Sequence, residues 1–221
     1  MSRWISALST LLALALVSPL FAPQLLAFPH HQKIGDTTVY AEMPITAELA
    51  DHLEQSDALL RTSPLFTEDY DSVIVLTQGG WRWSWLSLGA SDAFAVNRPF
   101  TDVIPVNRTD IRKGIVRNGK EIGGVRSLSA IIAHERVHAL MRNHLGILGE
   151  AMQPTWKVEG YADYVAQESS LTEAQYRTLI ANGHSHPAIV YYEGRKKVTD
   201  ILAANGGSVT ELFGKEGQSS N

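Results

Sequence analysis

Residues 127–141 read Ser-Leu-Ser-Ala-Ile-Ile-Ala-His-Glu-Arg-Val-His-Ala-Leu-Met. The periodicity of this stretch predicts a helix after Ser127. Because His134 and His138 are four residues apart, both imidazoles project from one face and can bind one tetrahedral metal ion. Glu135 projects about a quarter turn away. It can reach a metal-bound water instead of the metal, take its proton as a general base and return it to a leaving amine.

A second stretch supplies carboxylates. Residues 156–164 read Trp-Lys-Val-Glu-Gly-Tyr-Ala-Asp-Tyr and predict the start of another helix, with Glu159 and Asp163 on one face. Glu159 follows His138 by 21 residues, which leaves room for a loop and a helix that folds back beside the first. Glu159 is then a candidate third ligand, and Asp163 can orient a ligand imidazole. The alternative is a solvated acidic face beside two histidines that bind no metal.

His144 is a competing third ligand. It follows His138 by six residues, the spacing of the metzincin pattern H-E-x-x-H-x-x-G-x-x-H. That pattern needs glycine where this chain has Met141, because the helix must break there to bring the last histidine round. Methionine favours a continuing helix, which turns His144 by about 600° from His138 and points it away from the metal. We therefore expect Glu159 to be the third ligand.

The two stretches together resemble the gluzincin branch of zinc metalloproteases, whose best-known member is thermolysin. The residues that carry the resemblance are His134-Glu135-x-x-His138 and Trp156-x-x-Glu159-Gly160-x-Ala162-Asp163-Tyr164. Within that branch the chain is most similar to small bacterial domains called peptidase-MA-like, over Val73 to Phe213.

The resemblance implies a zincin-like fold, in which a small mixed sheet is followed by a helical half that carries the ligands. It implies one Zn²⁺ ion held by His134, His138 and Glu159, Glu135 as general base, and Asp163 as the partner of a ligand. It also implies that a strand upstream of the first helix, Ala93–Val96 or Val103–Val106, pairs with an extended peptide substrate.

Related enzymes often use a tyrosine or histidine to stabilise the oxyanion. Candidates in this chain are Tyr191 and Tyr192, at the start of a predicted helix, and His184 and His186 just before it. Their surroundings in the sequence match no motif that would choose among them.

Outside these stretches, the pattern predicts strands first and helices afterwards, which is typical of an α+β domain. The predicted strands are Thr37–Glu42, Ser72–Thr77, Ala93–Val96 and Val103–Val106, and a helix runs from Pro44 to about Arg61. A polar loop covers Gly114–Gly124. The later predicted helices are Leu128–Leu145, Thr155–Glu168, Thr172–Ala181, Ala188–Ala204 and Val209–Phe213, with a capping box formed by Thr172 and Gln175.

Three alternating tryptophans stand between the second and third predicted strands. As a strand, Trp81, Trp83 and Trp85 would share one face, which predicts a hydrophobic wall under the helices. A substrate or membrane-interface surface is the alternative interpretation.

The first 27 residues resemble a targeting segment. Arg3 is the only charged residue before Lys33, and the residues between them are mostly apolar. We expect either a cleaved signal peptide, with a cut after Ala22 or Ala27, or an uncleaved membrane anchor over residues 4–28. Both place the rest of the chain outside the cytoplasm, in the periplasm, secreted or held at the membrane.

Composition excludes several classes of protein. The chain of 221 residues has no cysteine, so disulfides, cysteine zinc sites and iron–sulfur clusters are impossible. Lys and Arg number 19 against 23 Asp and Glu, which gives a net charge of −4 and no basic field for nucleic acid.

We expect residues 28–213 to form a zinc peptidase-like domain and 214–221 a flexible tail. The predicted activity is hydrolysis of peptide or protein substrates by a metal-activated water. Two alternatives are a non-catalytic zinc-stabilised domain that binds peptides and a zinc hydrolase of a non-peptide amide.

Overall fold

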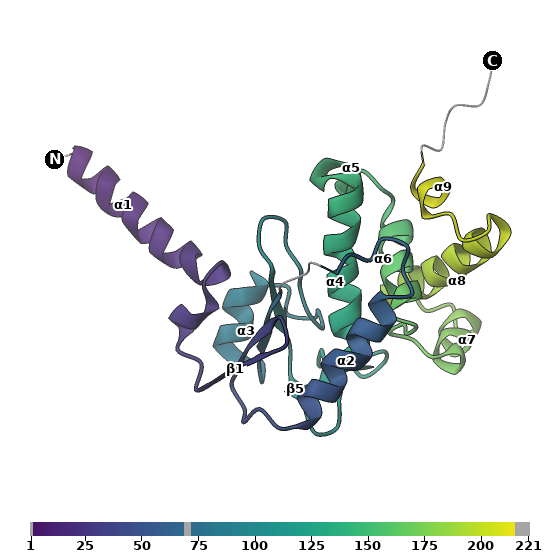
Figure 1. Ribbon diagram of the computed structural model, residues 1–221, viewed down its shortest axis with the longest axis horizontal. Helices are drawn as coiled ribbons and strands as arrows, with labels where there is room; N and C mark the ends of the chain where they lie inside the picture. The colour runs from purple at the N-terminus through teal and green to yellow at the C-terminus, as the bar shows by residue number, and fades with distance from the viewer. Residues whose placement is uncertain (1, 69–71, 215–221) are drawn as a thin grey trace, which may run out of the picture.

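A computed structural model describes residues 2–68 and 72–214, and its centre is a mixed four-stranded sheet (Figure 1). The strands lie in the order β1 (His30–Ile34), β2 (Thr37–Ala41), β3 (Ser72–Leu76) and β4 (Val103–Val106). The β1–β2 pair is antiparallel, whereas β2–β3 and β3–β4 are parallel. Two helices connect the parallel strands, and the remaining ones after the sheet follow the last strand, so the predicted α+β class is confirmed. The sequence did not predict β1.

The alternation of side chains along β3 divides the core into two layers. Ile74 and Leu76 face α2 (Glu48–Leu60) and the later helix α4 (Leu128–Leu145), which cover one side of the sheet. Val75 faces the other side, where it packs against Leu86 of α3 (Gly80–Ser87). Both faces of β3 are thus buried, which explains its continuous apolar sequence.

The segment that leads into the domain packs on the same side as α3. Two 3₁₀ turns, Ser18–Leu20 and Pro23–Leu26, follow α1 (Ser2–Val17). Leu20 and Leu26 are buried in one cluster with Val75, Leu86 and Val103. Residues 18–26 are therefore part of the folded body in this structure, and the expected division at residue 27 stays a prediction.

The helix α1 itself extends away from the body (Figure 1). It has 16 residues. Among the helices of the described residues, none is both long and apolar enough to cross a membrane.

The polar loop expected over residues 114–124 contains a strand. A small antiparallel sheet is formed by β5 (Thr109–Asp110), β6 (Ile115–Arg117) and β7 (Val125–Ser127). β7 leads directly into α4, whose first turn is capped by Ser127 because its hydroxyl accepts from the backbone N–H of Ala130 at 3.3 Å. The start of the HExxH helix is therefore fixed by a sheet immediately before it.

The predicted helical half is confirmed. It contains α5 (Ile147–Ala151), α6 (Thr155–Val165), α7 (Glu173–Ala181), α8 (Ala188–Ala204) and α9 (Val209–Phe213). Thr172 and Gln175 form the predicted capping box at the start of α7. The helix predicted over Thr155–Glu168 ends at Val165 instead, because the chain turns through Gln167, which has φ of +55°.

Two expected strands are wrong. The tryptophans lie on α3, and the helix turns about 200° between alternate residues. Trp83 is therefore buried at 3% exposure while Trp81 and Trp85 face outward, so they form no shared wall. Residues 93–96 make only an antiparallel bridge, Ala95 to Val106, along the edge of β4.

Candidate metal centre

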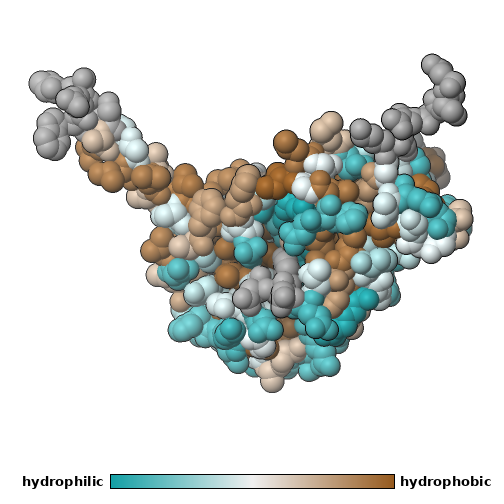
Figure 2. Space-filling model, turned by 45° about the horizontal axis from the view of Figure 1, so that its top comes forward, coloured by the Kyte–Doolittle hydropathy of each residue, from teal (hydrophilic) through white to brown (hydrophobic). Residues whose placement is uncertain are grey.

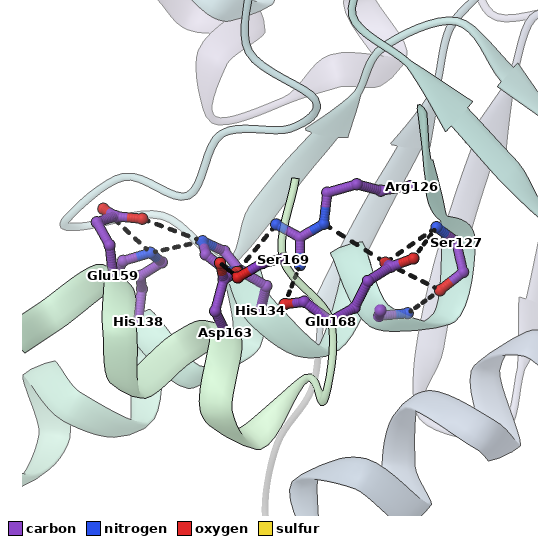
Figure 3. Close-up of polar contacts among 9 residues, drawn as sticks. Arg126, Ser127, His134, His138, Glu159, Asp163, Glu168 and Ser169 are labelled. Atoms are coloured by element: carbon purple, nitrogen blue, oxygen red, sulfur yellow. Dashed lines mark hydrogen bonds and ion pairs between the residues drawn. The ribbon is translucent and has the colours of Figure 1, made fainter. Parts of the chain in front are cut away.

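Two crossing helices bring the predicted ligands together. α4 carries His134 and His138, and α6 carries Glu159, with the two helices packed side by side (Figure 3). The Nε2 atoms of the two histidines are 3.3 Å apart. Glu159 places one carboxylate oxygen 3.3 Å from Nε2 of His134 and the other 3.8 Å from Nε2 of His138. Among the described residues, this is the one group of three acidic or histidine side chains close enough to share a metal ion.

Each imidazole is oriented by a carboxylate on its far nitrogen. Nδ1 of His134 lies 2.8 Å from Oδ1 of Asp163, and Nδ1 of His138 lies 3.1 Å from Oε1 of Glu150. A carboxylate accepts a hydrogen bond, so the ring proton of a neutral histidine belongs on Nδ1 in both residues. Both Nε2 atoms then present lone pairs to one another and to the carboxylate of Glu159. A metal cation bound between these atoms would satisfy all three of them, as a proton on one imidazole satisfies only part of the group.

The donors fit zinc in kind and in spacing. Neutral imidazole nitrogens and a carboxylate are common zinc ligands, and ligand atoms about 2.0–2.1 Å from a tetrahedral ion lie about 3.3 Å from one another. The 3.3 Å between the two Nε2 atoms matches that spacing. One oxygen of Glu159 is 3.3 Å from Nε2 of His134 and its other oxygen is 3.8 Å from Nε2 of His138, so the carboxylate lies within reach of the same ion. Three protein ligands also leave the fourth tetrahedral position open.

The pKa values of His134 and Asp163 are shifted in opposite directions by their contact. Burial alone lowers the pKa of His134, but the hydrogen bonds that its ring donates to Asp163 and Glu159 outweigh burial and raise that pKa to about 10. Burial would raise the pKa of Asp163, yet the Arg126 guanidinium and His134 lower it to about 2. The carboxylate of Asp163 is therefore ionised at neutral pH and draws positive charge to the histidine.

Arg126 connects this pair to the start of α4 (Figure 3). Its guanidinium is 3.0 Å from Oδ1 of Asp163, and Ser169 donates to the other oxygen at 2.7 Å. Arg126 also donates to the backbone carbonyl of Glu168, whose carboxylate accepts from the backbone N–H of Ser127. The helix carrying the histidines and the chain after α6 are thus linked by polar contacts that are buried at Asp163 and partly buried at Glu168.

Glu135 lies in a pocket beside the three donors. The pocket has a volume of about 460 Å³, and its lining includes His134, Glu135, His138, Glu159, Tyr191 and residues 93–97. Burial is the largest cause that raises the pKa of Glu135, and the two nearby histidines oppose it. A carboxylate in such surroundings can exchange a proton more readily than one in water.

The four candidates for stabilising the oxyanion differ in whether they reach the pocket. Tyr191 and His186 line the pocket. Tyr192 instead donates to Glu173 and stacks on Tyr176, with ring centroids 4.4 Å apart, and His184 is exposed. The structure therefore brings two of the four to the site.

Tyr191 stays protonated in its position. Burial, together with the negative charges of Glu159, Asp163 and Glu135, raises its pKa to about 12. Its hydroxyl makes no hydrogen bond to other described residues of the chain, so the proton is available to an acceptor in the pocket.

His144 lies outside the donor group. It is exposed on the last turn of α4. The helix continues unbroken through Met141, as the sequence analysis expected.

Sequence reasoning missed the residues that hold His138 and Glu135. Glu150 on α5 contacts His138 and also pairs with Arg142 at 3.3 Å. Arg142 donates to the amide oxygen of Asn97, and the amide nitrogen of Asn97 donates to the backbone carbonyl of Glu135 at 2.6 Å. The one available signal was the position of Glu150, twelve residues after His138 in a short segment that must fold back.

Comparisons with known proteins add no relative: no family model, no curated protein and no solved structure matches this chain.

Proposed function

We propose that this protein is a zinc-dependent metallopeptidase of the gluzincin type. One observation carries the proposal: the two Nε2 atoms and the Glu159 carboxylate converge within 3.3–3.8 Å, while carboxylates fix the opposite nitrogen of each ring. A buried carboxylate, Glu135, lies beside this group in an open pocket. The α+β architecture, in which a small mixed sheet precedes the helices that carry these residues, and the resemblance of the two motifs support the same proposal.

His134, His138 and Glu159 would hold the ion. A bound Zn²⁺ supplies the positive charge that activates a water molecule and polarises a carbonyl group. Glu135 takes the proton of the attacking water and delivers it to the leaving nitrogen. The protonated hydroxyl of Tyr191 can donate to the oxygen on which negative charge develops. Asp163 and Glu150 keep the imidazole lone pairs directed at the ion.

The edge of the sheet supports a peptide as substrate. Val96 donates its N–H to Pro105, and Phe94 accepts from Asn107, so both bond towards β4. Ala95 lies between them, and its N–H and carbonyl are directed away from β4, towards the pocket that it lines. Of the two predicted pairing strands, Val103–Val106 is enclosed between β3 and this segment. An extended peptide can therefore pair with residue 95, as a strand added to the edge.

The test is cleavage of a mixed peptide library by the full chain, followed by mass spectrometry, with zinc content measured on the same samples. Glu135→Gln should retain zinc and lose at least about 100-fold in rate, because general-base catalysis contributes that much or more. Glu121→Gln, at an exposed carboxylate, is the matched control and should behave as wild type.

Three outcomes contradict parts of the proposal. Unchanged cleavage in zinc-loaded Glu135→Gln would contradict the role of Glu135. Zinc-loaded wild type that binds peptides without cleaving them would favour the non-catalytic alternative. Hydrolysis of simple acyl amides but not of peptides would favour the alternative of a zinc hydrolase that acts on a non-peptide amide.

A further inference from the structure

Apolar side chains are exposed around the whole of α1 over residues 7–17, where Ser9 and Thr10 are the exposed polar residues. Six of them, Leu8, Leu11, Leu12, Leu14, Leu16 and Val17, are exposed to at least 46%. At about 100° per residue, these positions leave no gap wider than about 100° around the helix axis. A protein groove covers one side of a helix, whereas a helix that is apolar all round needs an apolar solvent.

Apolar exposure continues from α1 onto the body (Figure 2). We define the amino-terminal apolar surface as six exposed residues: Phe21, Leu25, Trp81, Trp85, Leu88 and Phe100. Trp85 donates its indole N–H to the carbonyl of Leu16, at the end of α1. The loop that carries Phe100 reaches the same segment, where the Thr101 hydroxyl is 3.5 Å from the carbonyl of Leu20.

The six residues of this surface carry no charge, although Asp102, two residues after Phe100, is exposed at its edge. Residues 4–29 contain no acidic, basic or histidine side chain. Arg82 lies between Trp81 and Trp83 on α3, but its guanidinium pairs with Glu42 at 3.0 Å and donates to the carbonyls of Leu26 and Ala27. The guanidinium also lies 4.6 Å from the centre of the Trp81 ring. The indole of Trp81 thus covers the charge and remains exposed itself.

We propose that the amino-terminal apolar surface rests on a lipid bilayer into which α1 inserts. The helix is about 24 Å long, which is shorter than the roughly 30 Å of hydrocarbon in a bilayer. Insertion of α1 therefore draws the following turns and α3 to the membrane–water interface. Tryptophan is enriched at that depth, because its ring is apolar and its N–H is polar. The partner is the lipid itself, and because the six residues of the surface offer no positive charge, binding does not require anionic lipids.

The test uses the absence of cysteine to place single fluorescent labels. An environment-sensitive NBD dye is attached to Leu88→Cys and Phe100→Cys on the body, and to Leu12→Cys on α1, in the full chain. Ile180→Cys is the matched control, since Ile180 is also exposed but lies on α7 at the other end of the molecule (Figure 1). The labelled proteins are mixed with phosphatidylcholine vesicles, with and without a nitroxide-labelled lipid.

The labels at positions 12, 88 and 100 should shift to shorter wavelength and be quenched by the nitroxide lipid, at low and high salt alike. The label at position 180 should do neither. A response at position 12 alone would overturn contact between the body and the bilayer. No response at any position would overturn the whole proposal. A shift at positions 88 and 100 that depends on protein concentration and resists the nitroxide lipid would assign the surface to a second copy of the chain instead.

Discussion

Glu150 is the residue on which the orientation of His138 depends. It contacts Nδ1 of His138 at 3.1 Å and is held there by Arg142. Removing such a partner typically weakens metal binding 10–100-fold. We therefore expect Glu150→Gln to weaken zinc binding by about that factor, as measured by competition with a chromogenic chelator. Glu121→Gln should leave the affinity unchanged, and an equal affinity in Glu150→Gln would show that Glu150 is dispensable.

The three candidate ligands and Asp163 were predictable, whereas Glu150 and Asn97 were not, for a physical reason. His134, His138, Glu159 and Asp163 repeat at helical spacing, so local geometry alone puts each pair on one face. Glu150 and Asn97 reach the site through chain reversals, which no short sequence pattern encodes. Tyr191 and Tyr192 are neighbours on α8 and project from different sides of that helix. Which side faces the pocket is set by the packing of α8 on α6, and the sequence does not reveal it.

At the scale of elements, the contact between α6 and α8 sets the position of Glu159. Gly160 and Gly194 allow the two backbones to touch, and a Cβ atom added at Gly194 would lie 2.4 Å from the carbonyl oxygen of Trp156. Gly194→Ala must therefore separate the helices. Overpacking of this kind costs about 1–3 kcal/mol or more, against a gain of about 1 kcal/mol in helix propensity.

We accordingly predict that Gly194→Ala lowers the free energy of unfolding and weakens zinc binding, because α6 carries Glu159. Urea unfolding followed by circular dichroism, with the chelator assay, measures both. Thr199→Ala, on the exposed side of the same helix, should change neither by much. If Gly194→Ala keeps the wild-type free energy of unfolding and zinc affinity, the two helices can accommodate a Cβ atom and the prediction is wrong.

The tryptophan segment shows where sequence patterns fail for elements. Alternation over five residues fits a strand, and it also fits a helix that buries only the middle residue. The backbone decides between them at Gly79 and Gly80, whose φ values of +82° and +72° turn the chain off the end of β3 into a helix. Apolar runs as short as this one do not distinguish the helical period of 3.6 residues from the strand period of two.

At the scale of the molecule, Tyr161 joins the helical half to the segment after α2. Its hydroxyl is 2.7 Å from the hydroxyl of Ser63, and its ring packs edge-on against Phe213. Burial raises the pKa of Tyr161 to about 12 from 10.0. The unfolded chain thus loses this proton above pH 10 while the folded protein keeps it. Stability is full below pH 10 and falls as pH rises towards 12, by up to about 3 kcal/mol.

Tyr161→Phe should remove the part of the alkaline dependence that Tyr161 contributes and leave the part due to Tyr191, whose pKa is also raised to about 12. The lost hydrogen bond costs about 1 kcal/mol at neutral pH. Urea unfolding at pH 9, 10 and 11 gives the free energy of unfolding of Tyr161→Phe and of wild type. Tyr164→Phe is the control, because it retains the buried hydroxyl of Tyr161. Equal slopes of stability against pH in wild type and Tyr161→Phe would contradict the prediction.

The α+β class followed from the order of strands and helices along the chain, which local patterns reveal. The packing of residues 18–26 on α3 could not be predicted from the sequence. Apolar residues that follow a targeting-like helix have the same pattern whether they face lipid or a protein core. Leu20 and Leu26 are buried while Leu25 and Phe21 are exposed, a distinction that only the tertiary structure makes.

The central claim is that His134, His138 and Glu159 hold one zinc ion. Crystals of the full chain grown with zinc, measured on both sides of the zinc absorption edge, test it directly. The account predicts one anomalous peak per chain, about 2.0–2.2 Å from Nε2 of each histidine and from a Glu159 oxygen. Crystals that show no peak at this position, or a peak bound by other residues, would contradict it.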